Sequence, residues 1–280
     1  AGSLPLCYYL IKNVSPYKST YIHDNAINEF VEFDVNKYNF IPNKNISLVN
    51  KVIKKTKNNL ENIFQFTPPK IKKDINEYSN KFSNIYSYPL INYVHKKIYI
   101  SYSKTPSIFH NGRPKLVLPN YSMGYPILDK DGIIDVGGRS SYVIFVKDDN
   151  IEHLQKIQKF FITNLALTLI NSLKTAQKFL STRTFILFPD PKEFEFEIND
   201  SSLEKYFNLN SNDKNAIEKQ VTKGEGNLTE KRREEIMNFS LKNYLNQTQI
   251  NEIKEKIKIH NKNNKSKRKT KKRYKKRNSI

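Results

Sequence analysis

Nine residues between positions 113 and 183 are candidates for contact with nucleic acid, because their side chains have suitable chemistry and lie near the ends of predicted strands and of a predicted helix. Arg and Lys bind phosphate oxygens and read guanine edges, whereas Asn and Gln can read adenine. The nine candidates are Arg113, Lys115, Asn120, Tyr121, Arg139, Lys174, Gln177, Lys178 and Arg183. We interpret this set as a DNA-binding surface. Taken singly, each residue would equally fit a solvated polar side chain at the end of a loop.

Residues that could carry out a reaction do not occur at useful spacings. A nuclease site could be imagined from the carboxylates of Asp24, Asp129, Asp131 and Asp135, but Asp129 and Asp131 lie in a predicted hairpin and a lysine partner on a neighbouring strand is not evident. Gly224 and Gly226 lie in a polar helical region and do not form a phosphate-binding loop. Zinc sites need clustered ligands, and the histidines are scattered. They are His23, His95, His110, His153 and His260.

Methyl transfer to adenine is also not encoded. The reaction needs Asn or Asp followed by Pro-Pro and an aromatic residue, which hold the amine and stack on a flipped base. Ser15-Pro16-Tyr17 lacks the second proline, and Thr67-Pro68-Pro69-Lys70 lacks both the polar acceptor and the aromatic. A cofactor loop of the FxGxG type is missing as well. We expect neither a catalytic residue nor a cofactor-binding or metal-binding residue in this chain.

The net charge predicts a polyanionic partner. The chain has 48 Lys and Arg against 27 acids, a net charge of +21, and residues 262–277 hold eleven of the positive charges without an acid. Subtracting these eleven still leaves about +10 elsewhere. Such charge favours nucleic acid first and an anionic membrane surface second. The tail would suit DNA attachment or nuclear import, while the charge of the body could also reflect composition alone.

Cysteine content and hydropathy bear on location. A single cysteine, Cys7, excludes an internal disulfide and fits a reducing intracellular compartment, either cytoplasm or nucleus. No apolar run approaches the roughly 20 residues that span a bilayer. The first residues do not resemble a signal peptide, and we expect them to continue from a longer protein.

The residue pattern predicts an α+β fold. We expect a mixed or antiparallel curved sheet covered by a long helix and followed by C-terminal helices and a disordered basic tail. Apolar runs predict strands at 4–11, 29–40, 97–101, 115–118, 141–146 and 185–188, with a hairpin of 125–128 and 133–136 about Asp131-Gly132. Helical spacing is found at 47–64, 151–173, 201–209, 211–219 and 229–260. Residues 65–107 suggest an irregular linker or an insertion.

The central block resembles a known family. The segment 112–138, the strand 141–146, the helix ending at Lys174-Thr175 and the segment 179–191 are similar to the C-terminal target recognition domain of adenine-N6 DNA methyltransferases, including versions from large DNA viruses. Residues 201–218 resemble the short helices that follow. Residues 4–11 resemble the last strand of the catalytic domain, so the similarity covers about 1–220. Thr175 to Phe179 replace the aromatic-glycine pattern that usually follows the helix.

This resemblance implies a domain plan and a function. Residues 1–45 would be the remnant of a catalytic domain, 46–107 a helix and linker, 108–200 the target recognition domain, 201–260 C-terminal helices and 261–280 the tail. The partners would be double-stranded DNA and a catalytic methyltransferase domain or subunit that binds S-adenosylmethionine, with no membrane partner. Two alternatives stay open: a non-catalytic nucleic-acid-binding protein and the recognition module of a restriction endonuclease.

Overall fold

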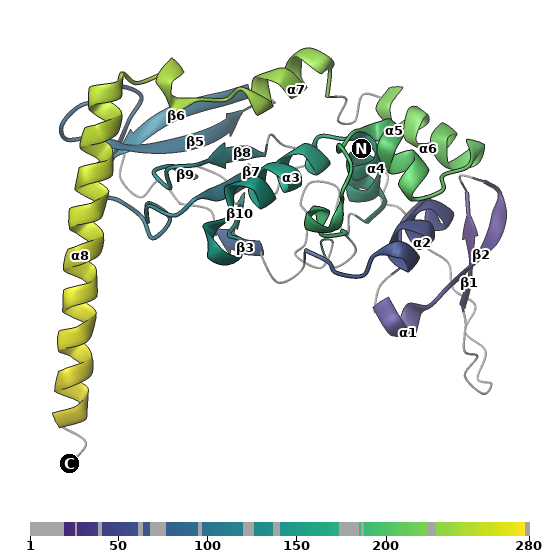
Figure 1. Cartoon of the computed structure of the whole chain (residues 1–280), viewed down its shortest axis with the longest axis horizontal. Helices are drawn as coiled ribbons and strands as arrows, with labels where there is room; N and C mark the ends of the chain where they lie inside the picture. Colours follow the sequence, from purple (N-terminus) through teal and green to yellow (C-terminus); the bar gives the residue numbers. More distant parts are fainter. Residues whose placement is uncertain are drawn as a thin grey trace, which may run out of the picture.

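Strands from the middle of the chain form two small sheets, and a separate ribbon precedes them in the computed structural model (Figure 1). In the first sheet the order is β3 (Phe64–Thr67), β10 (Ser141–Ile144), β7 (Lys115–Pro119) and β8 (Ile127–Asp129), all antiparallel. In the second it is β4 (Tyr78–Ser79), β6 (Lys97–Ser103), β5 (Tyr88–Val94) and β9 (Asp135–Val136). Only the β5–β9 pair of this sheet is parallel. The ribbon pairs β1 (Thr20–Asp24) with β2 (Glu29–Phe33).

Helices account for most of the C-terminal half, so the predicted α+β class is confirmed. The structure describes residues 20–25, 27–38, 41–60, 64–67, 77–94, 97–119, 126–136, 141–173, 185, 188–222 and 228–277. The helices are α1 (Val35–Tyr38), α2 (Ile46–Lys55), α3 (Ile151–Phe161), α4 (Asn164–Leu173), α5 (Asp200–Tyr206), α6 (Ser211–Thr222), α7 (Glu230–Met237) and α8 (Gln247–Arg277). Short 3-10 turns are η3 (Lys147–Asp149), η5 (Pro191–Glu193) and η6 (Leu241–Asn243).

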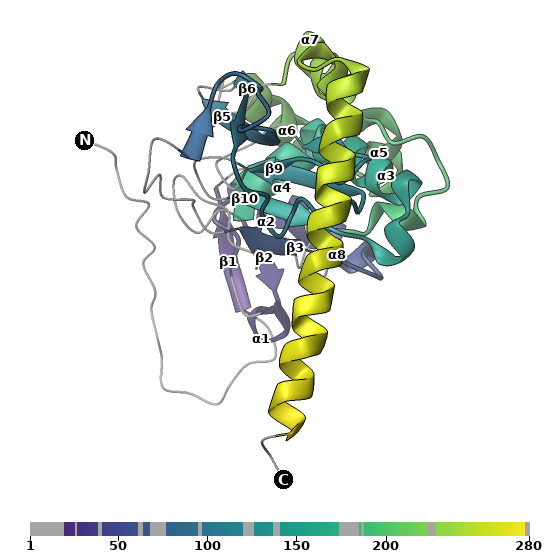
Figure 2. The same ribbon diagram turned by 90° about the vertical axis from the view of Figure 1, so that its left-hand side faces the viewer.

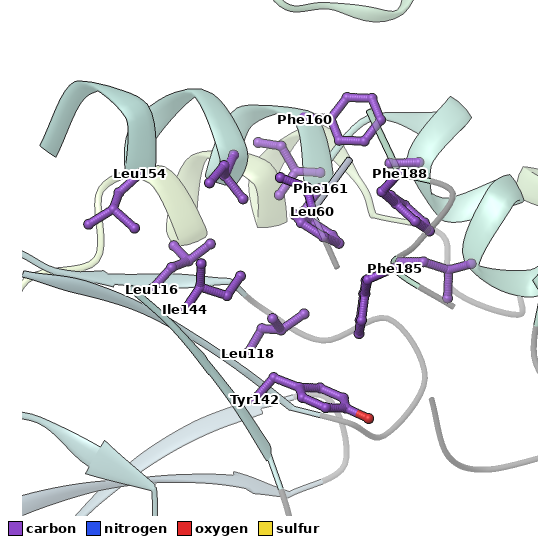
Figure 3. Close-up of a cluster of buried hydrophobic side chains, with 14 of the residues drawn as sticks. Leu60, Leu116, Leu118, Tyr142, Ile144, Leu154, Phe160, Phe161, Phe185 and Phe188 are labelled. Carbon is purple, nitrogen blue, oxygen red and sulfur yellow. The ribbon is translucent and has the colours of Figure 1, made fainter. Parts of the chain in front are cut away.

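The main core lies between α3 and the first sheet. Leu154 and Phe161, two helical turns apart, face Leu116 of β7 and other buried side chains (Figure 3). Phe160 points away from this sheet and packs against Phe188 and Phe194. Aromatic rings extend this cluster beyond the sheet, where Phe161 stacks on Phe188 with ring centroids 5.5 Å apart. Burial of this apolar surface is the main force that holds the helix on the sheet.

The predicted single helix at 151–173 is two helices. The apolar residues keep their helical spacing across the break, so the sequence periodicity does not reveal it. Thr163 causes it: the hydroxyl donates to the Phe160 carbonyl at 2.8 Å and accepts from the Ala166 N–H at 3.2 Å. Thr is a common N-cap residue, so the same side chain ends α3 and begins α4. The Asp200 carboxylate also accepts from the N–H groups of Asn164 and Leu165.

The predicted hairpin about Asp131-Gly132 and the single curved sheet are also corrected. β8 pairs with β7, but the residues after the turn leave that sheet and β9 pairs with β5 instead. The strands of the 112–146 block are therefore divided between two sheets. Residues 65–107 were predicted to be an irregular linker or an insertion, but within them β5 and β6 form a seven-residue antiparallel hairpin, so this part is not irregular.

Other predicted strands differ in part. The strand at 29–40 ends at Phe33 and gives way to α1, while 4–11 lies outside the described residues. Of 185–188, only Phe185 and Phe188 are described, and neither is in a strand. Both rings instead fill the core beside α3 (Figure 3).

The C-terminal region is also divided, and its tail continues as helix. Residues 229–260 contain α7, η6 and the first part of α8 rather than one helix. Asn246 and Gln249 form a reciprocal capping box, each accepting the other's backbone N–H at 2.9 Å, and this begins α8. The helix then runs to Arg277, in contrast to the predicted disordered tail. In both views its C-terminal end projects beyond the rest of the molecule (Figures 1 and 2).

A side-chain hydrogen bond between α3 and the segment before η5 makes stability depend on pH. The Nε2 atom of His153 lies 2.6 Å from Oδ1 of Asp190. Burial raises the pKa of Asp190, but bonds from His153 and the Lys192 N–H, together with their charges, outweigh it and lower the pKa below its usual value. The folded state thus binds a proton at Asp190 less readily than the unfolded state.

We expect Asp190→Asn to lower the free energy of unfolding by about 1 kcal/mol at neutral pH. The stabilisation is present above the unfolded pKa of about 4 and is lost as pH falls through the lowered folded pKa, so the gap to wild type should close in acid. Urea unfolding at several pH values measures this gap. Asp148→Asn, at an exposed carboxylate, is the control. A gap that stays constant with pH would contradict the assignment.

Candidate nucleic-acid interface

The candidate interface is helix α8 and the groove at its base. We call residues 247–261 the anchored half of α8 and residues 262–277 the basic arm. Ile250, Ile253 and Ile257 recur at intervals of three and four, and all three are buried. This apolar face holds the anchored half against the body, while the arm continues the same helix outward (Figure 2).

Three polar contacts fix the anchored half along its length. Lys254 Nζ lies 2.7 Å from Asp131 Oδ1. Lys256 Nζ donates to the Asn84 carbonyl at 3.2 Å, and Asn261 Nδ2 donates to the His110 carbonyl at 3.5 Å. Contacts to three separate segments of the body set the direction in which α8 leaves it.

A groove of about 630 Å³ lies where α8 meets the body. Its walls are α8 from Lys254 to Lys262, the segment 111–114 and the turn 130–133. Among the described residues that line it, four are lysines, Lys130, Lys254, Lys258 and Lys262, and one is an acid, Asp131, which is paired with Lys254. The groove is therefore a cationic hollow, suited to phosphate oxygens.

A buried ion pair holds the turn that forms one wall. Lys115 Nζ lies 2.6 Å from Asp129 Oδ2, and both side chains are almost fully excluded from solvent. The same carboxylate accepts the N–H groups of Ile134 at 2.7 Å and Ile133 at 3.2 Å. The prediction that Lys115 contacts DNA is therefore corrected, because its ammonium is buried and neutralises Asp129.

Two glycines bring the walls of the groove together. Gly132 has φ +67° and Gly112 has φ +74°, in the left-handed region that favours glycine. The Gly112 N–H donates to the Gly132 carbonyl at 3.0 Å. A methyl group on Gly132 would lie 2.2 Å from the Arg113 nitrogen, whereas one on Gly112 would meet nothing within 4 Å.

Arg113 is exposed beside this groove, as a DNA contact would require. Its Nε and Nη2 atoms donate to Asp149 Oδ1 at 2.9 and 2.8 Å, and its guanidinium lies over the Phe145 ring. Its contact with DNA stays a prediction. The other seven predicted residues lie outside the described part of the chain: Asn120, Tyr121, Arg139, Lys174, Gln177, Lys178 and Arg183.

Lys254 and Lys258 of the anchored half were missed from the sequence, because the long helix was assigned to a region outside the predicted recognition domain. Together with Lys262 of the basic arm, they recur every four residues. That spacing puts residues on one side of a helix and was the available signal. Their proximity to the turn at 130–133 required the tertiary structure.

Searches for other kinds of site were negative within the described residues. Among them, no group of three or more His, Cys, Asp or Glu could hold a metal ion. None of their helices has the length and apolar character needed to cross a bilayer. A scan against family models and a search of curated proteins found no match for the chain.

We expect Lys115→Met to destabilise the fold by about 3 kcal/mol, because it leaves the Asp129 charge buried without its cation. The free energy of unfolding from urea titrations measures the loss. Lys130→Met, at an exposed lysine one residue beyond Asp129, should cost less than about 0.5 kcal/mol. Equal costs for the two variants would show that the buried pair has no special role.

We expect Gly132→Ala to cost clearly more than Gly112→Ala. Both substitutions incur about 1 kcal/mol of left-handed backbone strain, but only the first drives a methyl group into backbone atoms. The comparison therefore isolates the packing of the turn against the 112–113 segment. Thermal and urea unfolding measure both. If the two alanines cost the same, that close packing is wrong.

Proposed function

We propose that this protein binds duplex DNA and that the basic arm of α8 supplies the main phosphate contacts. The observation that carries the proposal is the continuity of α8. The first half of α8 is anchored to the body. The same helix continues through residues 262–277, which include eleven Lys and Arg residues and no acid. Neutralising phosphates with such charge releases condensed counterions, which is a strong and salt-sensitive driving force.

The composition of the arm favours nucleic acid over a membrane surface. A helix that lies in a membrane interface needs an apolar face opposite its basic one. Between residues 262 and 277 the only large apolar or aromatic residue is Tyr274. The arm thus has charge for a polyanion but lacks the apolar surface for insertion among lipids.

A fuller role rests on the family resemblance of the central block. We propose that the body is the target recognition portion of an adenine-N6 DNA methyltransferase, whose catalytic domain or partner would bind S-adenosylmethionine and methylate the base. In this scheme the arm gives general affinity, and the 112–191 block gives sequence preference. A non-catalytic DNA-binding protein and the recognition module of an endonuclease remain the alternatives.

We expect removal of residues 262–280 to weaken duplex binding by at least about tenfold near 0.1 M salt. The slope of log affinity against log salt should also become shallower by at least about 3, since each neutralised phosphate contributes roughly 0.9. Fluorescence anisotropy across a salt series measures both. The truncation leaves the anchored half intact, and an unchanged unfolding midpoint is the control for folding.

The same two chains separate general from specific binding. If the truncated chain still enriches a common sequence from a pool of random duplexes, the recognition role gains support. If it binds every duplex equally, that role fails while DNA binding by the arm stands. If the intact chain does not bind duplex DNA at all, the proposed function is wrong.

A further inference from the structure

The groove and the arm share a row of lysines. Lys254, Lys258 and Lys262 line the groove at intervals of four residues, so they lie on one side of α8. Lys130 lies across the groove on the turn after β8. Because the anchored half is fixed to the body, the place where this row begins is fixed as well.

The row continues along the arm. Residues 265, 269, 272 and 276 follow at intervals of three and four, and each is Lys. Because successive residues of a helix are rotated by 100°, these four positions lie on the same side of α8 as Lys254, Lys258 and Lys262. We call the seven positions the lysine stripe, and from 254 to 276 it is about 33 Å long at 1.5 Å per residue.

We infer that the groove and the lysine stripe form one continuous track for the phosphates of double-stranded nucleic acid, a claim that rests on the proposed function. Phosphates at one end of the bound site enter the groove beside Lys130 and Lys258. Further along the duplex, phosphates of both strands meet the stripe where the two backbones cross it. The groove thereby fixes the position of the duplex relative to the body, which a freely placed charged segment would not.

The groove favours a duplex over a single strand. Proteins that bind single strands stack bases on aromatic side chains along a basic groove. None of the described residues lining this groove is aromatic. A duplex keeps its bases stacked inside and presents only phosphates and groove edges, and over about 33 Å it is nearly straight. A straight row of lysine positions can lie along such a duplex and meet phosphates of each strand where the backbones cross the row.

The nearby acids leave the track positive. Asp131, the acid that lines the groove, lies 2.7 Å from Lys254. Glu255 lies 3.5 Å from Lys258, but both side chains are largely exposed, and such pairs contribute little. Phosphate can therefore replace Glu255 as the partner of Lys258 at small cost.

The direct test compares two sets of Lys/Arg→Gln substitutions that remove four charges each. One removes the stripe in the arm: Lys265→Gln, Lys269→Gln, Lys272→Gln and Lys276→Gln. The control removes Lys267, Arg268, Lys271 and Lys275, which occupy other sides of the helix. Gln keeps helix propensity close to that of Lys and Arg. We expect the stripe set to weaken duplex binding at least about tenfold more than the control set.

A second pair of variants tests the groove itself. Lys130→Ala with Lys258→Ala should make the duplex salt slope shallower by about 2 and weaken affinity at least about fivefold. Lys159→Ala with Lys205→Ala removes the same charge from exposed positions on α3 and α5, and should change affinity less than about twofold. Binding of a single strand of equal length should respond much less to the groove pair.

The outcomes separate this inference from the proposed function. If both four-charge sets and both lysine pairs have equal effects on duplex binding, the arm acts as diffuse charge and the track is wrong, although DNA binding stands. If single strands respond to the groove pair as strongly as duplexes, the preference for a duplex is overturned. Tighter binding to phosphatidylcholine–phosphatidylserine vesicles than to any DNA would overturn both proposals.

Discussion

The buried ion pair between Lys115 and Asp129 organises the region from which α8 departs. It joins β7 to β8 at the point where β8 ends, and the same carboxylate holds the backbone of the turn that follows. That turn carries Asp131, which holds Lys254 of α8. A charge this deeply buried is costly unless it is paired and fully hydrogen-bonded, so the arrangement tolerates little displacement. The direction of the basic arm thus depends on a contact inside the core.

Repulsion among the positive charges of the basic arm destabilises its helical form. Like charges at intervals of three and four residues repel one another along a helix. In α8 the capping box at Asn246 and three buried isoleucines stabilise the anchored half, and this stabilisation offsets the repulsion. A polyanion that neutralises the arm removes the repulsion. Binding and the straight helical form of the arm therefore favour each other.

Local signals predicted the elements better than their connections. The strands at 115–118 and 141–146 and the helices α5 and α6 follow from apolar spacing, whereas the helix predicted over 47–64 ends at Lys55 as α2 and residue 64 begins β3. The break at Thr163 was readable as a cap but was concealed by unbroken periodicity. The pairing of β9 with β5 was not readable, because Asp131-Gly132 has the chemistry of a hairpin turn whichever sheet the chain enters next. Burial of Lys115 was equally hidden, since a lysine before a strand normally remains in solvent.

The candidate site was also predicted only in part from the sequence. Charge counting identified residues 262–277 as the segment for a polyanion, but helical continuity and anchoring come from the capping box and from contacts with Asn84, His110 and Asp131. The proximity of the turn at 130–133 to α8 could not be predicted from the sequence.

Amide hydrogen exchange with and without a saturating duplex shows whether the groove and the basic arm bind DNA together. If they do, DNA slows exchange both along residues 262–277 and in the segments 111–114 and 130–133 that form the groove. Slower exchange in the arm alone would show that the groove is not a contact. Unchanged exchange in both regions would show that neither binds the duplex.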